Sequence, residues 1–384
     1  MRVLIAHNTY QQRGGEDSVV EAEIDLLRAM GHAVHPYTRS NDDLAIMPMS
    51  SAALETMWSQ QTTHELAVLI QGFQPDVIHV HNTFPLMSPS LYWAASSAGV
   101  PVVQTLHNFR LLCPQAMFLR DGKVCEDCLG KVPWRGAVRG CYRGSKAQSS
   151  VLASMVTLHR ALGTWQNKVT RYIALNDFCR NKFIEGGLPA DRIVVKPNFV
   201  DFDAPAVAAR SGFLFVGRLS AEKGVDVLVE AIRVLDGAKM RVAGTGPESG
   251  LLPGVAGLEA LGALAGEAVR VEMSQAMALV LPSIWYENFP RTLVEAFGCG
   301  LPVIASRIGA LAELVQDGIT GLLFEPGNAR DLSDKMRWAQ AYPAQMAKMG
   351  RNARALYEAE FTAERNYAQL MQIYKDAVAV GCAN

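Results

Sequence analysis

The sequence lacks the features that mark membrane-spanning, secreted and nucleic-acid-binding proteins. It has 36 Lys and Arg against 37 Asp and Glu in 384 residues, so no excess of positive charge favours nucleic acid as a partner. No apolar run approaches the roughly 20 residues that cross a bilayer. The apolar start at residues 2–6 is too short for the core of a signal peptide. We therefore expect a cytoplasmic protein.

Cysteine is also sparse, and nothing indicates a disulfide framework. Seven cysteines without a secretory signal favour reduced thiols. Four of them, Cys113, Cys125, Cys128 and Cys141, follow the pattern C-x11-C-x2-C-x12-C. The central pair has a spacing that suits tetrahedral zinc, and four thiolates would close a structural site. Buried thiols without a metal are the alternative.

Acidic residues are absent from Cys128 to Asn176, while basic and aromatic residues recur between positions 131 and 171. Such a segment is typical of a surface that docks on anionic lipid or holds a pyrophosphate-linked lipid acceptor. A solvated basic face and a patch for a soluble anionic glycan are the alternatives. We expect peripheral contact with the inner face of a membrane.

Short β-rich apolar runs alternate with helical stretches, and this pattern predicts an α/β fold with parallel sheets. The alternation pauses at residues 197–205, which contain two prolines, and then restarts. We predict two Rossmann-like, doubly wound domains, 1–198 and 199–361, that face each other across a cleft. Ligands should bind outside the carboxyl ends of the strands. A helix at about 362–380 is expected to pack back on the first domain.

The alternation gives the expected elements. The predicted strands are 2–6, 33–37, 76–80, 101–106, 171–175, 192–195, 212–217, 239–243, 256–261, 276–281, 302–305 and 320–324. The predicted helices of the first half are 16–30, 51–72, 88–98, 150–166 and 177–185, and the tail from 328 to 380 is mostly helical. The segment 107–149 fits neither pattern, so we predict an elaborated loop, a kind of segment that is usually functional.

Two motifs in the second half indicate a site for an anion and a sugar. Arg218 and Lys223 flank the start of a helix, where free N–H groups and two cations suit a diphosphate, although solvated loop cations are the alternative. Glu287 lies in the loop after a buried strand, and Glu295 lies about one turn into the next helix. Carboxylates at these positions can accept hydrogen bonds from sugar hydroxyls, and capping roles are the alternative.

Together these motifs resemble the retaining nucleotide-sugar glycosyltransferases of the two-domain B type, known as glycosyltransferase family four. The resemblance covers essentially the whole chain. It includes the glycine loop GGED, the PDVIHVHN strand, the TLHNFRLLCP segment, the GRLSAEKG loop, the Glu-x7-Glu pair and the VEAFGCGLPVIAS helix and strand.

The resemblance implies roles for individual residues. It assigns His107 to the sugar and the leaving phosphate, Glu287 to the transferred sugar, and Glu295 to the ribose. It implies retention of the anomeric configuration without a metal or other cofactor, and the chain has no Asp-x-Asp triplet. The residues implied to bind the donor are Gly14, Gly15, Arg218, Lys223, Asn288, Phe289, Arg291 and Glu295.

One departure from the family leaves the donor sugar open. Many relatives have Glu-x-Phe-Gly-Leu where this chain has Glu287-Asn288-Phe289-Pro290-Arg291. Pro290 has no N–H to donate and would suit the first helical position. Arg291 is either structural or faces an anionic sugar. The alternative functions are a nucleotide-sugar epimerase on the same fold and a non-catalytic subunit that binds sugar nucleotides or glycans.

Overall fold

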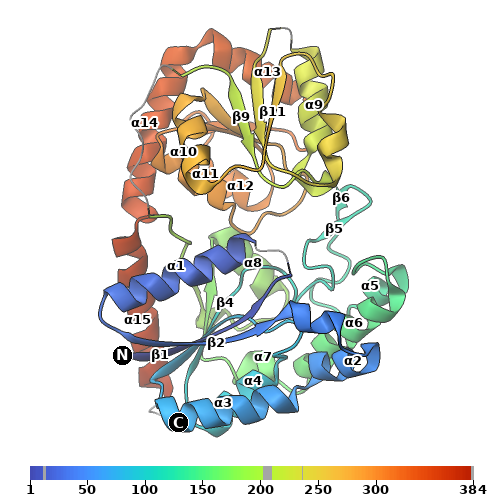
Figure 1. Cartoon of the computed structure of the whole chain (residues 1–384), viewed down its shortest axis with the longest axis vertical. Helices are drawn as coiled ribbons and strands as arrows, with labels where there is room; N and C mark the ends of the chain where they lie inside the picture. Colours follow the sequence, from blue (N-terminus) through green and yellow to red (C-terminus); the bar gives the residue numbers. More distant parts are fainter. Residues whose placement is uncertain (12–13, 202–209, 236, 382–384) are drawn as a thin grey trace. The chain divides into compact units, whose positions relative to one another are not determined.

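The computed structural model describes residues 1–11, 14–201, 210–235 and 237–381, and the chain divides into two compact units (Figure 1). Part of the predicted linker, 202–205, lies outside the described residues. The first unit comprises Met1–Phe118, Glu126–Pro197 and Asn366–Asn384, and the second comprises Leu119–Cys125 and Asn198–Arg365.

The first unit is built on a six-stranded parallel sheet with the order β2-β1-β3-β4-β7-β8. Its strands are β1 (Arg2–Thr9), β2 (Ala33–Ser40), β3 (Val77–Asn82), β4 (Val102–Thr105), β7 (Arg171–Ala174) and β8 (Ile193–Val195). Its longer helices are α1 (Gly15–Ala29), α2 (Met49–Met57), α3 (Gln60–Phe73), α4 (Ser90–Ser97), α6 (Lys146–Ala161) and α8 (Asp177–Glu185). Each predicted strand of the first half is present.

The last helix, α15 (Ala363–Gly381), completes the core of the first unit. Leu370 and Tyr374 of this helix are fully buried against Val3 and Ile5 of β1. Apolar residues three and four positions apart lie on one face of a helix, and this face covers the sheet. Most of α15 therefore belongs to the first unit.

Two predictions for the first half were wrong in detail. The helix expected at 51–72 is two helices, α2 and α3, and Ser59 caps the second by accepting a hydrogen bond from the Thr62 N–H at 3.0 Å. The segment 107–149 holds regular structure as well as loop. It contains the hairpin β5 (Leu119–Arg120) and β6 (Lys123–Val124), the helix α5 (Trp134–Arg139) and the start of α6.

The second unit is a parallel sheet with the order β11-β10-β9-β12-β13-β14. Its strands are β9 (Phe213–Val216), β10 (Met240–Ala243), β11 (Leu258–Gly262), β12 (Ala278–Leu281), β13 (Val303–Ser306) and β14 (Gly321–Phe324). Its helices include α9 (Val225–Val234), α10 (Gly266–Gln275), α11 (Arg291–Gly298), α12 (Gly309–Leu314), α13 (Ala329–Ala341) and α14 (Pro343–Glu360). The predicted class, α/β with two doubly wound sheets, is confirmed.

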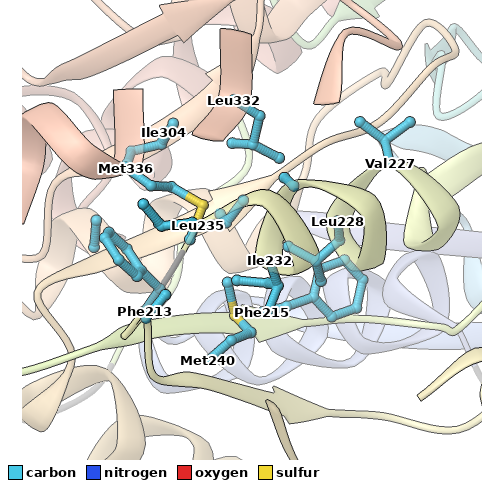
Figure 2. Packing of buried hydrophobic residues seen from close by; sticks show 14 of the residues in the cluster. Phe213, Phe215, Val227, Leu228, Ile232, Leu235, Met240, Ile304, Leu332 and Met336 are labelled. Atoms are coloured by element: carbon cyan, nitrogen blue, oxygen red, sulfur yellow. The ribbon is translucent and has the colours of Figure 1, made fainter. Parts of the chain in front are cut away.

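Apolar side chains of α9 anchor the core of the second unit (Figure 2). Leu228 and Ile232 lie one turn apart and pack towards Phe215 and Met240 of the sheet. All four are at most 2% exposed. This packing fixes the start of α9 beside the end of β9. Among the described residues, no helix is both long and apolar enough to cross a bilayer.

Candidate functional site

The strand order of the second unit brings two of the predicted motifs together. β9 lies between β10 and β12, and the direction of strand addition reverses between β9 and β12. Ligands of open α/β sheets bind at such a reversal, outside the carboxyl ends of the strands. Arg218 and Lys223 follow β9, while Glu287 follows β12. The two motifs therefore border the same edge.

Backbone contacts hold the loop after β9 in place. The Leu219 N–H donates to the Thr245 carbonyl at 2.9 Å. Gly244 is a glycine for steric reasons, since a Cβ there would lie 1.9 Å from the Gly217 carbonyl oxygen. Gly224, which precedes α9, has φ 69° and would place a Cβ 2.0 Å from the Pro282 carbonyl oxygen. The glycine turn at 244–246 is thus a support for the loop that carries Arg218.

Lys223 and Glu287 form an ion pair, with 2.6 Å between Nζ and Oε1. The Ser283 hydroxyl donates to the same Oε1 at 2.7 Å. The side chain of Glu287 is 8% exposed and that of Lys223 is 25% exposed. The ring centroid of Trp285 lies 5.6 Å from Nζ. The pair is therefore held at the edge of the sheet with one side open to solvent.

A second pair lies at the start of α11. Arg291 Nε is 3.1 Å from Glu295 Oε1, one turn further along the helix. Burial raises the pKa of Glu295, and the neighbouring Arg291 guanidinium opposes that rise. The expectation that Pro290 would be the first helical residue was wrong, because Pro290 is the N-cap and α11 begins at Arg291.

The other predicted donor ligands of the second unit differ in exposure. Arg218 is exposed and, within the part of the chain that the structure describes, forms no ion pair. Asn288 is buried. Phe289 is partly buried and packs against Phe361, with ring centroids 6.0 Å apart.

In the first unit, the glycine loop is organised by a carboxylate. Gly14 is the N-cap of α1, and its N–H donates to Asp17 Oδ2 at 2.8 Å. The other oxygen of Asp17 lies 2.8 Å from His7 Nε2. A Cβ at Gly15 would meet nothing within 4 Å, so packing does not explain this glycine. Close approach of a ligand remains the expectation.

The sequence interpretation missed Glu16, which follows these glycines. The Tyr10 hydroxyl donates to Glu16 Oε2 at 2.8 Å. Burial raises the pKa of Glu16 to about 8, and the nearby Asp17 carboxylate adds to the rise, while the hydrogen bond from Tyr10 opposes it. A carboxyl that keeps its proton near neutral pH can donate a hydrogen bond to an anion.

His107 lies directly after β4 and contacts a second histidine. Its Nε2 is 2.9 Å from His81 Nδ1, and the two rings stack with centroids 5.1 Å apart. Burial lowers the pKa of His107 well below its usual value, and the His81 ring adds to this effect. His107 is therefore neutral near pH 7.

Behind His107 lies a buried polar cluster around Glu23 that the sequence did not reveal. Glu23 Oε1 is 2.8 Å from His79 Nδ1 and 3.4 Å from His81 Nε2, and Glu23 Oε2 is 3.2 Å from Lys196 Nζ. Burial alone would raise the pKa of Glu23, but Lys196 and the histidines hold it well below its usual value. Burial also lowers the pKa of His81 to about 3.

The same cluster has the spacing of a metal site. The ligand atoms of Glu23, His79 and His81 lie within 4.8 Å of one another, but the Lys196 ammonium already neutralises the carboxylate. Three of the predicted cysteines, Cys113, Cys128 and Cys141, belong to the first unit. Among the described residues of that unit, these three do not form a group whose ligand atoms all lie within 4.8 Å of one another. Zinc at the four cysteines, with Cys125 as the fourth, stays a prediction.

Comparison with known proteins finds a family model for each half of the chain. The model described as Glycosyltransferase Family 4 matches residues 13–204, half of the chain, and the model described as Glycosyl transferases group 1 matches residues 208–356. An uncharacterized glycosyltransferase of Methanocaldococcus jannaschii is 37% identical over 129 residues, which cover 32% of this chain and 36% of that protein.

Other relatives are more distant and cover more of the chain. A phosphatidyl-myo-inositol mannosyltransferase of Mycobacterium leprae is 25% identical over 88% of this chain and 86% of its own length. The crystal structure of an Anabaena protein in complex with UDP-glucose aligns over all of both chains with a TM-score of 0.66 and 17% identity, which shows a shared fold. The family 4 model matches half of the chain, and the group 1 model matches the second half. The chain therefore belongs to glycosyltransferase family 4.

Proposed function

We propose that this glycosyltransferase moves a sugar from a nucleoside-diphosphate sugar to a glycan or lipid-linked acceptor, with retention of configuration and without a catalytic metal. One observation carries the proposal. Lys223 and Glu287 meet at 2.6 Å where the strand order reverses, beside the exposed Arg218. This edge offers cations for a diphosphate and a carboxylate for sugar hydroxyls.

The proposed roles are those that the family resemblance implies, and the chemistry of each group suits them. Arg218 and Lys223 bind the diphosphate, Glu295 accepts hydrogen bonds from the ribose, and Glu287 accepts them from the transferred sugar. In the reaction the bond from the anomeric carbon to the diphosphate oxygen breaks. The acceptor oxygen bonds to that carbon, and its proton passes to the leaving diphosphate. Fixed cations stabilise the charge that develops on this oxygen.

His107 is proposed to act beside the sugar, as the family resemblance implies. Its low pKa leaves the ring neutral, so it can take part in a hydrogen bond with a sugar hydroxyl without carrying a charge. The contact of Nε2 with His81 Nδ1 and the stacking of the two rings fix the orientation of His107. Holding reactive groups in the right orientation is a large part of catalysis when no covalent intermediate with the enzyme forms.

Contact with an anionic membrane surface is a further part of the proposal. It is supported by the exposure of Trp134 and Val138 on α5, at 57% and 60%, among the basic residues of the segment 131–171. Aromatic and basic side chains together favour binding at a lipid interface. Arg139 is already 2.5 Å from Asp127, so Arg135 and Lys146 are better choices for charge reversal. Release of the double variant from anionic vesicles is the expected result.

The first experiment is a thermal-shift panel with UDP-, GDP-, ADP- and CDP-sugars in buffer that contains EDTA. A ligand at 100 times its Kd should stabilise the protein by about 2.7 kcal/mol. We expect one nucleotide class to stabilise the wild type and an exposed control, Glu230→Ala on α9, but not Glu295→Ala. No response from a folded sample to any of these donors would favour the non-catalytic alternative.

The stereochemistry and the epimerase alternative need a second measurement. Proton NMR of the reaction should show an anomeric coupling constant in the product that matches that of the donor. An epimerase would convert the donor without any acceptor present. Such conversion, or inversion of the anomeric centre, would contradict the proposed reaction.

A further inference from the structure

The first unit contains an apolar cavity that the proposed donor site does not use. Its volume is about 420 Å³, within the range that holds small organic ligands. One wall comes from α2 and the residues before it, and the other from α6 and the residues before it. Met47, Ala53 and Leu152 are among the lining residues. Of the described residues that line it, only Arg143 is charged.

The helix α2, which forms one wall of this cavity, and the residues just before it expose three large apolar side chains. Ile46 is 88% exposed, Met49 72% and Leu54 70%, and all three lie on α2 or just before it. Contiguous exposed apolar side chains mark sites for apolar ligands or partners. Hydrocarbon is therefore the chemistry that suits both the lining and the entrance.

A single cation stands at the edge of this apolar lining. Arg143 is exposed and has φ 54°, a backbone conformation that non-glycine residues rarely adopt. Gly144 follows it with φ 68°. Glycine would suit position 143 better on conformational grounds. The guanidinium carbon of Arg143 lies 5.4 Å from the ring centroid of Tyr142, which also lines the cavity, so the cation is held beside the lining. Guanidinium groups bind phosphate through paired N–H donors.

The aromatic wall of the cavity leads to His107. Phe84 lines the cavity and also lines a small hollow that His107 and Arg110 border. The Arg110 guanidinium carbon lies 4.3 Å from the Phe84 ring centroid and 5.3 Å from that of Tyr142. Phe84 and Tyr142 meet edge to face at 5.9 Å. A second cation thus stands between the cavity and the histidine.

We propose that this cavity holds the hydrocarbon chain of a phosphate-bearing lipid acceptor. Arg143 and Arg110 bind the phosphate, and the group that receives the sugar points along Phe84 towards His107. This inference rests on the proposed glycosyl transfer and names the class of its acceptor. The arrangement suits one lipid chain in a defined cavity, which distinguishes it from general adhesion to a membrane surface.

The test is isothermal titration calorimetry of the whole chain with farnesyl phosphate, a single isoprenoid chain that carries one phosphate. Farnesol and inorganic phosphate are titrated in parallel. We expect one farnesyl phosphate per chain, at least tenfold weaker binding of farnesol, and no binding of inorganic phosphate. Equal affinity for farnesol and farnesyl phosphate, or binding of many copies per chain, would overturn the proposal.

Two variants with matched controls locate the ligand. Ala53→Trp fills the cavity from α2 and should weaken farnesyl phosphate at least tenfold, whereas Ala161→Trp at the exposed end of α6 should not. Arg143→Gln should weaken farnesyl phosphate binding about tenfold and leave farnesol binding unchanged, whereas Arg28→Gln, an exposed change on α1, should alter neither. Binding that survives Ala53→Trp overturns the cavity as the site.

Donor binding measured on the same samples separates this inference from the proposed function. Ala53→Trp should keep its donor-induced thermal shift, which also shows that the variant is folded. Loss of farnesyl phosphate binding with an intact donor shift supports the cavity as an acceptor site. A wild type that responds to donors but does not bind farnesyl phosphate overturns the inference and leaves the proposed transfer standing.

Discussion

The ammonium of Lys223 lies 2.6 Å from the carboxylate of Glu287, so two proposed ligands of the donor contact each other directly. The Ser283 hydroxyl donates a hydrogen bond to the same carboxylate at 2.7 Å. A diphosphate that takes over Lys223 would release Glu287 to accept hydrogen bonds from the sugar. The pair is therefore both a structural contact and a preformed half of the site.

Lys223→Met should separate these two roles. The nearly buried Glu287 would lose its cation, and we expect the free energy of unfolding to fall by about 1–2 kcal/mol, less than for a fully buried pair because Lys223 is partly exposed. Lys348→Met on the exposed face of α14 is the control. In urea denaturation, the double variant Lys223→Met with Glu287→Gln should recover the stability that Lys223→Met loses, although it should still not bind the donor. If the double variant recovered both stability and donor binding, the pair would have only a structural role.

Gly244→Ala should damage the loop that carries Arg218. The new methyl group would meet the Gly217 carbonyl oxygen at 1.9 Å, and both partners are backbone, so the loop must move. We expect at least a tenfold loss of donor affinity, because displaced binding groups lose their geometry. Gly250→Ala, where a Cβ meets nothing within 4 Å, is the control. Titration calorimetry would contradict the supporting role if the two variants bound equally.

Glu23→Gln should destabilise the first unit by about 3–5 kcal/mol. Lys196 is 1% exposed and would keep a buried charge without its carboxylate. Asp25→Asn, an exposed change on the same helix, should have little effect. Chemical denaturation of Glu23→Gln combined with Lys196→Met should recover much of the loss. Equal instability of the single and double variants would show that the pairing is not the main contribution of Glu23.

Glu16 should make stability depend on pH. Its pKa is raised to about 8 in the folded protein, so between about pH 4.5 and pH 8 the unfolded chain releases a proton that the folded protein keeps. The contribution of Glu16 to stability is therefore complete below pH 4.5 and is lost as the pH rises, by at most about 1.4 kcal/mol per pH unit. Glu16→Gln should remove this slope.

Denaturation curves of the wild type and Glu16→Gln at pH 5, 6.5 and 8 would test this dependence. The advantage of Glu16→Gln over the wild type should grow with each step in pH. Glu230→Gln, an exposed change on α9, should follow the wild type throughout. Parallel curves for all three proteins would mean that Glu16 ionises normally.

Much of the fold could be predicted because strands and helices of α/β proteins have different apolar periods. The strand before Lys223 and the strand before Glu287 were both found from short buried runs. The break at Ser59 was missed because no glycine or proline marks it. Its cause is tertiary, since the Ser59 N–H donates to the Ser88 hydroxyl, 29 residues away.

The candidate site likewise has one part that could be predicted from the sequence and one that could not. Lys223 and Glu287 could be placed together because both follow neighbouring strands of one sheet. The cluster behind His107 could not, because its partners come from distant parts of the chain: Lys196 lies 173 residues from Glu23, and Tyr374 donates or accepts at His79 across 295 residues. Motifs and apolar periods within short stretches of sequence do not reveal contacts between residues so far apart.

The return of α15 to the first sheet has a consequence for the order of assembly. While the ribosome is still making the second unit, the first lacks the helix that covers Val3 and Ile5 and supplies Tyr374 to His79. Until α15 is made, the first unit therefore keeps an apolar face uncovered. An exposed apolar face of this kind favours aggregation of incompletely made chains.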